Sequence, residues 1–499
     1  MGAFSTILTE ITKYQKKNGL PVNETWVDMA AKVNIPKAKS GITLEYEGMT
    51  NNVTVKQADV LLMGLRLKLP NYTLKEQRQD FLYYDQKQSP DGPAMTDTIS
   101  AMVMNKIGAS GCSAFIRQGN AQLQFLRGPW YQMSEQANDD KNANGGVAPA
   151  NPFLTASAAS LQIPVFGYVG HTQLEDQVTI RPALPAPLKN LQVADFYSKG
   201  NRFRAIMNST HTNITRLPVE LPGFYDSFIN QPMPFLVERR NATEDAIYAT
   251  AHNITMNETV TVENNMYWQQ LTIPNNFLQC QPTTSGGQYV VGNFPGAATD
   301  GDPGTRWQPL TQNASNITVD TRNVPFQRVK RISVEWGPRT PKFARVGFTN
   351  ETELPLILKT TKFIELHPIT NQIYGMDTPN DEVVPYKGNS TEYIVPEDLK
   401  DHARFRSGNY TILVVEGCEG CGKLVQMTHE NGTKYWQDDG LGASVGEFAV
   451  IGETGMDIVQ NLNGVTADER SGTKDDVVDK QEAQNTAMRE QWSSQRVNT

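Results

Sequence analysis

The sequence predicts a multidomain protein of the α plus β class, with helices in its first third and strands in most of the rest. Apolar residues recur at helical spacing up to about residue 171. From residue 172, short runs of alternating apolar and polar residues lie between Pro, Gly and Asn. At 499 residues the chain is long enough for about three domains. We expect helices over residues 1–171, a small β domain over 172–270, a second β domain over 275–455 and a disordered polar tail over 456–499.

The individual elements follow from these two periodicities. Helical spacing occurs in residues 4–11, 54–69, 74–87 and 94–107. Pro70 and Pro90 separate the later helices, because proline cannot continue a helix. Alternating runs occur in residues 177–180, 260–262, 332–336 and 411–415. Short strands at such intervals indicate β-sandwiches.

Composition and motifs exclude several classes of protein. The formal net charge of −8 argues against a nucleic-acid partner, which needs a basic surface. No apolar run approaches the roughly twenty residues of a membrane span, and the longest candidate, Leu61–Leu69, contains Arg66 and Lys68. The histidines form no close metal-binding pair, and there is no P-loop or Rossmann fingerprint. We therefore predict no cofactor and no metal among the site residues.

The stretch from Gly128 to Gln136 carries the mixture of side chains that a sugar site needs. Trp130 and Tyr131 offer aromatic faces for the apolar face of a pyranose, and the amides can bond its hydroxyls. The carboxylate of Glu135 can activate a water for glycoside hydrolysis. The alternative is that Glu135 is an ordinary surface or packed residue.

Several motifs around this stretch occur in a fixed order. They are Val55-Lys56-Gln57-Ala58-Asp59-Val60, Gln88 to Thr96, Ser134-Glu135-Gln136, Asn151-Pro152-Phe153-Leu154-Thr155, Phe166-Gly167-Tyr168, Arg181 to Pro185, Phe196-Tyr197 and Asn208 to Thr212. In this order and spacing they resemble the C-terminal part of the fungal acid trehalases, members of glycoside hydrolase family 65. The resemblance covers roughly residues 2–220 and, more weakly, residues 275–455.

The resemblance implies a fold for the first half of the chain. Residues 1–171 are expected to be the last helices of an (α/α)6 catalytic barrel, and residues 172–270 the small β domain of the family. A large piece of the barrel is then missing from this sequence. We expect exposed helix faces and poor solubility of this chain alone.

The resemblance also implies inverting hydrolysis of α,α-trehalose or a related α-glucoside. One carboxylic acid protonates the glycosidic oxygen, and a carboxylate about 6.5–9.5 Å away activates water on the opposite face. The motif match makes Glu135 the general base, with Gln136 beside it in the substrate site. Lys56 and Gln57 match the Lys-Gln pair that contacts glucose hydroxyls, and Trp130 lines the sugar subsite. The alternatives are a solvated helix face for Lys56 and Gln57 and ordinary core packing for Trp130.

Two departures from the family pattern bear on activity. The family's proton donor lies shortly ahead of a motif that leads into Gly-Ala-Phe, and here Met1 directly precedes Gly2. No residue of this chain is therefore expected to act as the donor. The family's glycine-rich loop is replaced by residues 156–160, Ala-Ser-Ala-Ala-Ser. Alanine lacks the backbone freedom of glycine, so close approach of this segment to a ligand is in doubt.

A second resemblance lies in residues 297–307. The run from Asp300 to Trp307, Asp-Gly-Asp-Pro-Gly-Thr-Arg-Trp, resembles the signature of discoidin-like (galactose-binding-like) β-sandwiches. Many such modules bind sugars, so a cell-wall glycan becomes a further expected partner. The alternative is a sandwich that only packs against the enzyme, with Trp307 in its core. Calcium stays open, because Asp300 and Asp302 supply oxygen ligands.

Glycosylation signals indicate the secretory route. Asn-x-Ser/Thr sequons begin at Asn23, Asn52, Asn71, Asn208, Asn213, Asn241, Asn253, Asn257, Asn313, Asn316, Asn350, Asn389, Asn409 and Asn431. Chance gives about five, and the alternative is an Asn- and Thr-rich β protein without glycans. We expect an extracellular, cell-wall or vacuolar protein, although no signal peptide precedes Gly2.

The cysteines fit an oxidising compartment. Cys418 and Cys421 have the spacing of a redox or zinc motif, but a second close pair for zinc and a thioredoxin-like context are lacking. We predict a disulfide, most simply between Cys280 and one of these two, while Cys112 completes the set.

Two functions follow from these observations. The first is trehalose hydrolysis, with this chain supplying the general base and lacking the proton donor. The phosphorylases of the same family are a rival that Glu135 disfavours, because its negative charge repels an attacking phosphate. The second is a non-catalytic glycan-binding or structural remnant of such an enzyme.

Overall fold

The fold is taken from a computed structural model of the chain. It describes residues 2–51, 53, 55–67, 69, 72–88, 92–107, 112–141, 144, 146–173, 178–219, 228, 231–241, 246–266, 272–325, 328–367, 382–384, 389–400, 405, 408–418, 425–428, 434–437 and 440–452. The predicted tail over residues 456–499 lies outside them. The chain is of mixed α and β structure with several sheets, as the sequence predicts at that level.

The chain divides into two compact units, each described here by itself. Unit 1 comprises Met1–Gln270, Gln372–Asn389 and Gln426–Gln437. Unit 2 comprises Leu271–Asn371, Ser390–Val425 and Asp438–Thr499. The finer predicted division of the chain into an incomplete barrel, a small β domain and a discoidin-like domain stays a prediction.

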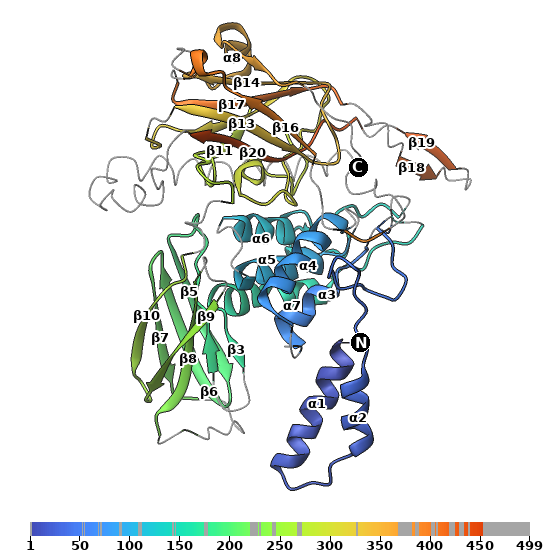
Figure 1. Ribbon diagram of the computed structural model, residues 1–499, viewed down its shortest axis with the longest axis vertical. Coiled ribbons are helices and arrows are strands. Elements are labelled where there is room, and N and C mark those ends of the chain that lie inside the picture. The colour runs from blue at the N-terminus through green and yellow to red at the C-terminus, as the bar shows by residue number, and fades with distance from the viewer. Residues whose placement is uncertain are drawn as a thin grey trace. The chain divides into compact units, whose positions relative to one another are not determined.

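The described helices of unit 1 lie in its first 170 residues (Figure 1). They are α1 (Gly2–Lys17), α2 (Glu24–Lys32), α3 (Val60–Leu62), η1 (Met63–Leu67), α4 (Leu74–Lys87), α5 (Met95–Ile107), α6 (Ser113–Leu123), α7 (Leu154–Gln162) and η2 (Ile163–Tyr168). The predicted helix over residues 74–87 matches α4. Its start is fixed by a capping box, in which the Thr73 hydroxyl accepts from the Glu76 N–H at 3.2 Å and the Glu76 carboxylate accepts from the Thr73 N–H at 2.8 Å.

The helix predicted over residues 54–69 is wrong over residues 55–59, which lie ahead of the first helical residue. Val55 lies in a β-bridge with Gln88, and its N–H donates to the Lys87 carbonyl at 2.9 Å. The helix begins at Val60, whose N–H donates to the Glu45 carboxylate at 3.2 Å. A cap supplied by a residue fifteen positions away leaves no local signature in the sequence.

A buried ion pair crosses the helical core. Arg117 of α6 bonds through Nη2 to the Asp85 carboxylate of α4 and through Nη1 to Asp97 of α5 at 3.3 Å. The side chains of Arg117 and Asp85 are 5% and 0% exposed. A buried guanidinium needs such partners, because an unpaired charge in the interior is costly.

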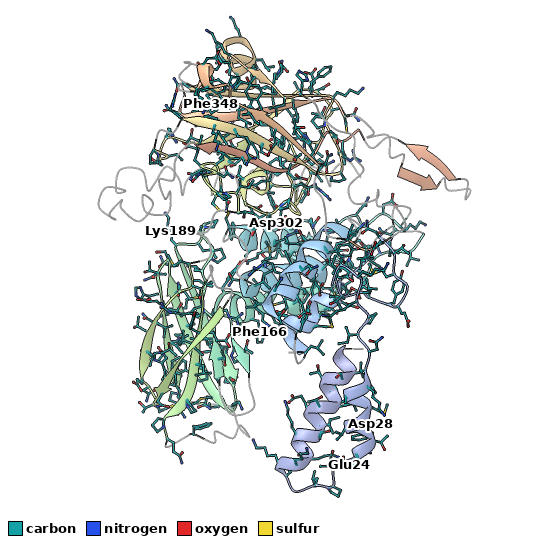
Figure 2. All side chains as sticks on the ribbon, viewed as in Figure 1. Glu24, Asp28, Phe166, Lys189, Asp302 and Phe348 are labelled. Atoms are coloured by element: carbon teal, nitrogen blue, oxygen red, sulfur yellow. The ribbon has the colours of Figure 1, made fainter. Side chains whose placement is uncertain are left out.

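The two N-terminal helices carry an unusual share of exposed apolar side chains. None of the residues of α2 is buried. The exposed side chains are Phe4, Ile7 and Tyr14 on α1 and Trp26 and Met29 on α2, with Leu20 in the connection between them. Glu24 and Asp28, labelled in Figure 2, lie on α2 of this helical hairpin. Within the described residues, no helix has the length and apolarity that crossing a membrane requires.

Between residues 172 and 263, unit 1 forms two four-stranded sheets, drawn in green in Figure 1. Their strands are β3 (Thr172–Gln173), β4 (Val178–Ile180), β5 (Asn190–Ser198), β6 (Asn201–Asn208), β7 (His211–Leu217), β8 (Met233–Asn241), β9 (Ala246–Ile254) and β10 (Thr259–Glu263). One four-stranded sheet has the order β10-β7-β6-β5 and the other β3-β4-β8-β9. Side chains of both sheets share one core with the helices, including Phe203, Phe235 and Tyr168.

Unit 2 contains a five-stranded and a three-stranded sheet, with one large hydrophobic core and a smaller cluster of Ile357, Ile412 and Val414. Its elements are β11 (Thr283–Ser285), η4 (Pro295–Thr299), β12 (Ser315–Asp320), β13 (Val329–Trp336), β14 (Phe343–Thr349), α8 (Leu354–Thr360), β15 (Ile364–Glu365), β16 (Ser390–Ile394), η6 (Glu397–Leu399), β17 (Tyr410–Glu416) and β20 (Val445–Gly452). The sheet orders are β11-β12-β17-β14-β15 and β16-β13-β20. A separate pair, β18 (Val425–Thr428) with β19 (Lys434–Gln437), belongs to unit 1 apart from Val425. Trp307 is fully buried in the core, which confirms the alternative that it is a core residue.

Candidate functional site

A short hairpin that the sequence did not predict presents the aromatic residues of the site. β1 (Leu126–Arg127) pairs with β2 (Gln132–Met133), and residues 128–131 form the connecting tip. Trp130 is 80% exposed and Tyr131 is 64% exposed. The interpretation of Trp130 as a core residue is therefore wrong, because the hairpin lifts both aromatic side chains away from the interior.

Glu135 follows directly after β2 and is held by its backbone on two sides. Its N–H donates to the Ala150 carbonyl at 2.9 Å, and its carbonyl accepts from the Ala94 N–H at 2.9 Å. Its carboxylate accepts from the Ala150 N–H through Oε2 at 3.2 Å. The side chain is partly exposed. The backbone that carries this carboxylate is therefore held in place, while the carboxylate itself remains open to a water or substrate.

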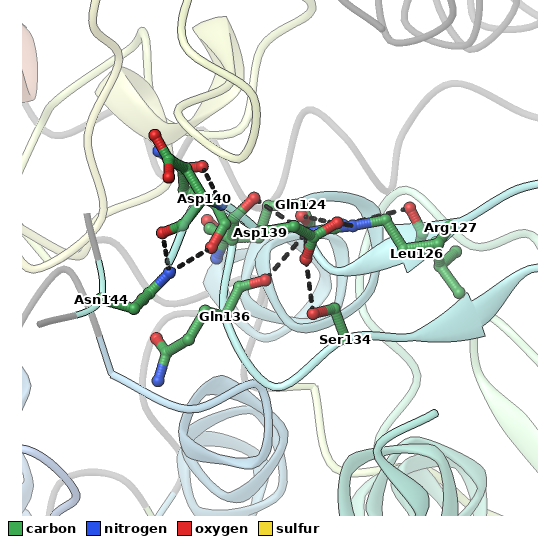
Figure 3. Close-up of polar contacts among 10 residues, drawn as sticks. Gln124, Leu126, Arg127, Ser134, Gln136, Asp139, Asp140 and Asn144 are labelled. Atoms are coloured by element: carbon green, nitrogen blue, oxygen red, sulfur yellow. Dashed lines mark hydrogen bonds and ion pairs between the residues drawn. The ribbon is translucent and has the colours of Figure 1, made fainter. Parts of the chain in front are cut away.

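The residues on either side of Glu135 are buried. Ser134 is 0% exposed, and its Oγ donates to Asp139 Oδ1 at 2.7 Å. Gln136 is 8% exposed, and its side chain points away from the group of polar contacts drawn in Figure 3. Its Oε1 has no hydrogen-bond partner among the described residues. A buried amide oxygen without a partner is free to accept from a ligand hydroxyl or a water.

A buried arginine that no sequence pattern indicated organises this loop. The guanidinium of Arg127 binds the carboxylate of Asp139 and the carbonyls of Gln136 and Ala137, the two residues that follow Glu135 (Figure 3). Arg127 is 7% exposed. Its position in a two-residue strand gives no periodic signal, so its burial could not be read from the sequence.

Lys56 and Gln57 do not lie on a helix face, which corrects the alternative proposed for them. They form a bend ahead of α3, with Lys56 exposed and Gln57 Nε2 donating to Asp59 Oδ1 at 2.7 Å. Within the described residues, the side chains of Gln57 and Glu135 are bonded to Asp59 and to Ala150 respectively, and not to each other. Their role as glucose ligands stays a prediction.

The segment expected to replace a glycine-rich loop is helical. Residues 156–160 lie inside α7, with Ala156 and Ala159 buried. Alanine and serine allow this helix, whereas glycines would weaken it. The backbone N–H groups of this segment are engaged in helix hydrogen bonds wherever the helix is regular, so they are not presented to a ligand as a loop would present them.

The acidic residues near the discoidin-like motif are buried in unit 2. Asp300, Asp302 and Glu447 are 1%, 3% and 4% exposed. Asp300 accepts from the Asp302 N–H at 2.9 Å and from the Thr305 hydroxyl at 2.8 Å, and Glu447 accepts from the Gly301 N–H at 2.9 Å. Burial raises the pKa of Asp300 well above its usual value, as it does for Glu447, and the neighbouring carboxylates add to both effects. No group of three His, Cys, Asp or Glu side chains that could hold a metal ion occurs in the described residues.

A separate cavity of about 210 Å³ lies in unit 1, away from the residues predicted for the site. Its lining includes Lys106, His171 and Arg181. Phe166, labelled in Figure 2, stacks on His171 with ring centres 5.8 Å apart, where the helices meet the sheets. Arg181 is paired with Glu238, and its Nη1 donates to the Lys106 carbonyl at 2.9 Å.

The predicted disulfide chemistry is confirmed for the described cysteines. Cys112, Cys280 and Cys418 are each disulfide-bonded, while Cys421 lies outside the described residues. The specific partner predicted for Cys280 stays a prediction.

Fungal acid trehalases are among the sequence relatives of this chain and match most of its length, whereas the protein-glucosylgalactosylhydroxylysine glucosidase of Mus musculus, 28% identical, covers 38% of this chain. The acid trehalase of Emericella nidulans is 30% identical over 472 residues, which cover 91% of this chain and 42% of the relative. The cell wall acid trehalase of Arthroderma benhamiae is 28% identical over 488 residues, covering 90% of this chain and 43% of the relative. The resemblance found from the motifs is thus confirmed, and the chain spans less than half the length of the curated relatives it matches.

Other comparisons add little. No known family profile matches the chain. A chitosan-binding module from a chitosanase/glucanase of Paenibacillus sp. IK-5 is 16% identical, with a TM-score of 0.21, and covers 36% of this chain and 98% of the module. A structural likeness of that size supports no argument about fold or function.

Proposed function

We propose that this chain is part of a glycoside hydrolase that cleaves α,α-trehalose, with Glu135 as the general base. The observation that carries the proposal is the placement of Glu135. Its backbone is bonded to Ala94 and Ala150, its carboxylate is partly exposed, and the exposed Trp130 lies on the hairpin just before it. The acid trehalase relatives favour trehalose as the substrate.

The proposed reaction uses the carboxylate of Glu135 on water. Glu135 removes a proton from the water while the water oxygen forms a bond to C1 of one glucose. The bond from C1 to the bridging oxygen breaks, and a general acid protonates that oxygen as the second glucose leaves. Attack from the face opposite the leaving group inverts C1 and yields β-glucose from that ring. The general acid is not assigned to any residue of this chain.

Three kinds of contact would hold the sugar. The ring of Trp130 covers the apolar face of a glucose, and its 80% exposure leaves that face free. Gln136 Oε1 accepts a sugar hydroxyl, which satisfies a buried oxygen that has no partner among the described residues. Lys56 and Gln57 bind further hydroxyls from the bend ahead of α3.

A non-catalytic function is the second candidate. The helical structure of residues 156–160 favours it, because the family's glycine-rich loop is replaced there by part of α7. In this alternative the exposed aromatics of the hairpin and unit 2 bind glycans without cleaving them. Relatives named as cell wall or secreted proteins favour an extracellular or cell-wall location for either function. A vacuolar location is a further prediction from the sequence.

Glucose release from trehalose tests the proposed activity. We would compare the full chain, produced with its glycans, with its Glu135→Gln variant, which keeps the shape of the side chain and removes the base. The proposal predicts that the variant loses at least about 10²-fold in rate. Glu258→Gln is the matched control, because Glu258 also accepts a backbone N–H, from Thr255 at 2.7 Å, but lies on the small β domain. Binding of trehalose without release of glucose by either protein would favour the non-catalytic function.

A further inference from the structure

We propose that the ion pair between Arg127 and Asp139 is a positioning device for Glu135, and that Arg127 is the residue on which the placement of the base depends. The inference rests on the proposed function, because it concerns the carboxylate assigned there as the base. Arg127 and Asp139 need not touch the substrate. They act through the backbone on both sides of Glu135.

The contacts of Arg127 converge on one short loop. Its Nε donates to Asp139 Oδ2 at 2.5 Å, and its Nη2 donates to Asp139 Oδ1 at 3.0 Å. The same Nη2 donates to the carbonyls of Gln136 at 2.8 Å and Ala137 at 2.9 Å. Its Nη1 donates to the carbonyl of Gln124 at 2.9 Å. Figure 3 shows these bonds meeting at the guanidinium.

Both neighbours of Glu135 are tied to this ion pair. Ser134, on its N-terminal side, donates its hydroxyl to Asp139 Oδ1 at 2.7 Å. Gln136, on its C-terminal side, accepts a hydrogen bond from Arg127 through its backbone carbonyl. The Ser134 N–H also donates to the Phe125 carbonyl at 2.9 Å. The backbone of Glu135 is thus fixed from both flanks, independently of its own bonds to Ala94 and Ala150.

The chemistry of arginine suits this task. A guanidinium offers five N–H donors in a rigid plane, and here they serve one carboxylate and several carbonyls at once. A lysine offers a single ammonium with three donors and cannot form the bidentate pair. The carboxylate of Asp139 neutralises the buried charge, which would otherwise be costly. Arg127→Lys therefore keeps the charge and removes the geometry.

Misplacing a base by about 1 Å costs on the order of 10²-fold in rate even when substrate binding is intact. We expect Arg127→Lys to lower kcat for trehalose by about 10- to 100-fold with KM nearly unchanged. Asp139→Asn should act in the same direction, and Ser134→Ala more weakly, because it removes one hydrogen bond. A role in general stability alone would not separate kcat from KM in this way.

The matched control is Arg216→Lys. Arg216 is fully buried and donates to the carbonyls of Gln231 at 2.8 Å and Phe228 at 2.6 Å, but it lies on the small β domain. This substitution should lower the melting temperature without lowering kcat of the folded protein. An equal loss of kcat in both lysine variants would overturn the positioning role.

Hydrogen exchange of the full chain gives a second readout that does not need activity. One peptide covering residues 132–137 and another containing residue 94 include the backbone amides that form hydrogen bonds around Glu135. The proposal predicts faster exchange of these amides in Arg127→Lys and Asp139→Asn, with α5 unchanged. Unchanged exchange there would overturn the proposal. A wild-type chain without trehalase activity would count against the proposed function alone, and the exchange experiment would still decide the positioning role.

Discussion

Glu135 and Ala150 form a reciprocal pair of hydrogen bonds. The Glu135 N–H donates to the Ala150 carbonyl at 2.9 Å, and the Ala150 N–H donates to the Glu135 carboxylate at 3.2 Å. Two motifs that are separate in the sequence, Ser134-Glu135-Gln136 and the segment leading into Asn151-Pro152, therefore meet at the proposed base. The carboxylate depends for its position on a neighbouring segment as well as on its own loop.

Removal of the exposed indole of Trp130 should weaken the binding of trehalose more than it lowers kcat. Trp130→Ala removes a face that covers one sugar ring, a loss on the order of 1–2 kcal/mol, or about tenfold in KM. We expect kcat to change little, because stacking on the ring is the same in the ground and transition states. Initial rates over a range of trehalose concentrations measure both parameters.

The control for this prediction is Tyr248→Ala, since Tyr248 is also exposed but lies on β9 in the sheet β3-β4-β8-β9. An equal rise in KM in the two variants, or no rise in Trp130→Ala, would contradict the proposal that the Trp130 ring covers a glucose.

The buried ion pair of the helical core should dominate the stability of unit 1. Arg117→Ala leaves the fully buried carboxylate of Asp85 without its partner, which typically costs about 3–5 kcal/mol in the free energy of unfolding. Lys32→Ala breaks the exposed pair with Asp28 on α2 and should cost at most about 0.5 kcal/mol. Chemical denaturation followed by helical circular dichroism measures the difference. Similar losses of free energy of unfolding in the two variants would show that burial does not determine how much these ion pairs stabilise the fold.

Unit 2 should lose stability as the pH rises. The pKa values of Asp300 and Glu447 in the folded state lie well above their usual values, which are about 3.9 and 4.3 in an unfolded chain. The folded state therefore binds more protons, so the stabilisation is complete below about pH 4 and is lost as the pH rises through the raised values. Asp300→Asn removes one of these titrations and should flatten the dependence.

Melting of both proteins between pH 4.5 and 8, in buffers with EDTA, tests this sign. The free energy of unfolding of Asp300→Asn, relative to that of the wild type, should increase with pH. The increase is up to about 1.4 kcal/mol per pH unit for one group within its titrating range. Wild-type stability that rises with pH relative to the variant would contradict the prediction. A parallel series with calcium in place of EDTA separates a proton effect from a bound ion.

The helical hairpin of α1 and α2 should limit the solubility of the isolated chain. Ile7 and Met29 are 53% and 41% exposed, on helices that bury little of their apolar surface. Replacing both by Gln should raise the concentration at which the chain stays monomeric in light scattering. Its melting temperature should stay close to that of the wild type, because few contacts are removed. Unchanged association would show that aggregation starts elsewhere.

Regular elements of this fold were predictable where their signals are local. α4 (Leu74–Lys87) has a capping box at its start and a clear apolar spacing, so its range was read from the sequence. The start of α3 was missed because its cap comes from Glu45, across a long loop. Local propensity says nothing about such a partner.

The sequence indicated the residue types of the proposed site, but it did not indicate their geometry. The motif around Glu135 indicated a carboxylate beside an aromatic residue, and both lie on one hairpin and its following turn. The exposure of Trp130 and the burial of Arg127 depend on a hairpin too short to leave a periodic pattern. The role of Asp139 likewise follows only from the folding of the loop back onto Arg127.

The central claim is that Glu135 acts as the base on water, and hydrolysis of α-D-glucosyl fluoride tests it most directly. Fluoride leaves as a weak base and needs no proton donor, so the missing assignment of the general acid does not affect this reaction. Water attacks C1, its proton passes to Glu135, and fluoride and β-glucose are released. The account predicts fluoride release by the full chain with β-glucose as the first product in proton NMR, and a loss of at least about 10²-fold in Glu135→Gln. Equal rates in the two proteins, or α-glucose as the first product, would contradict it.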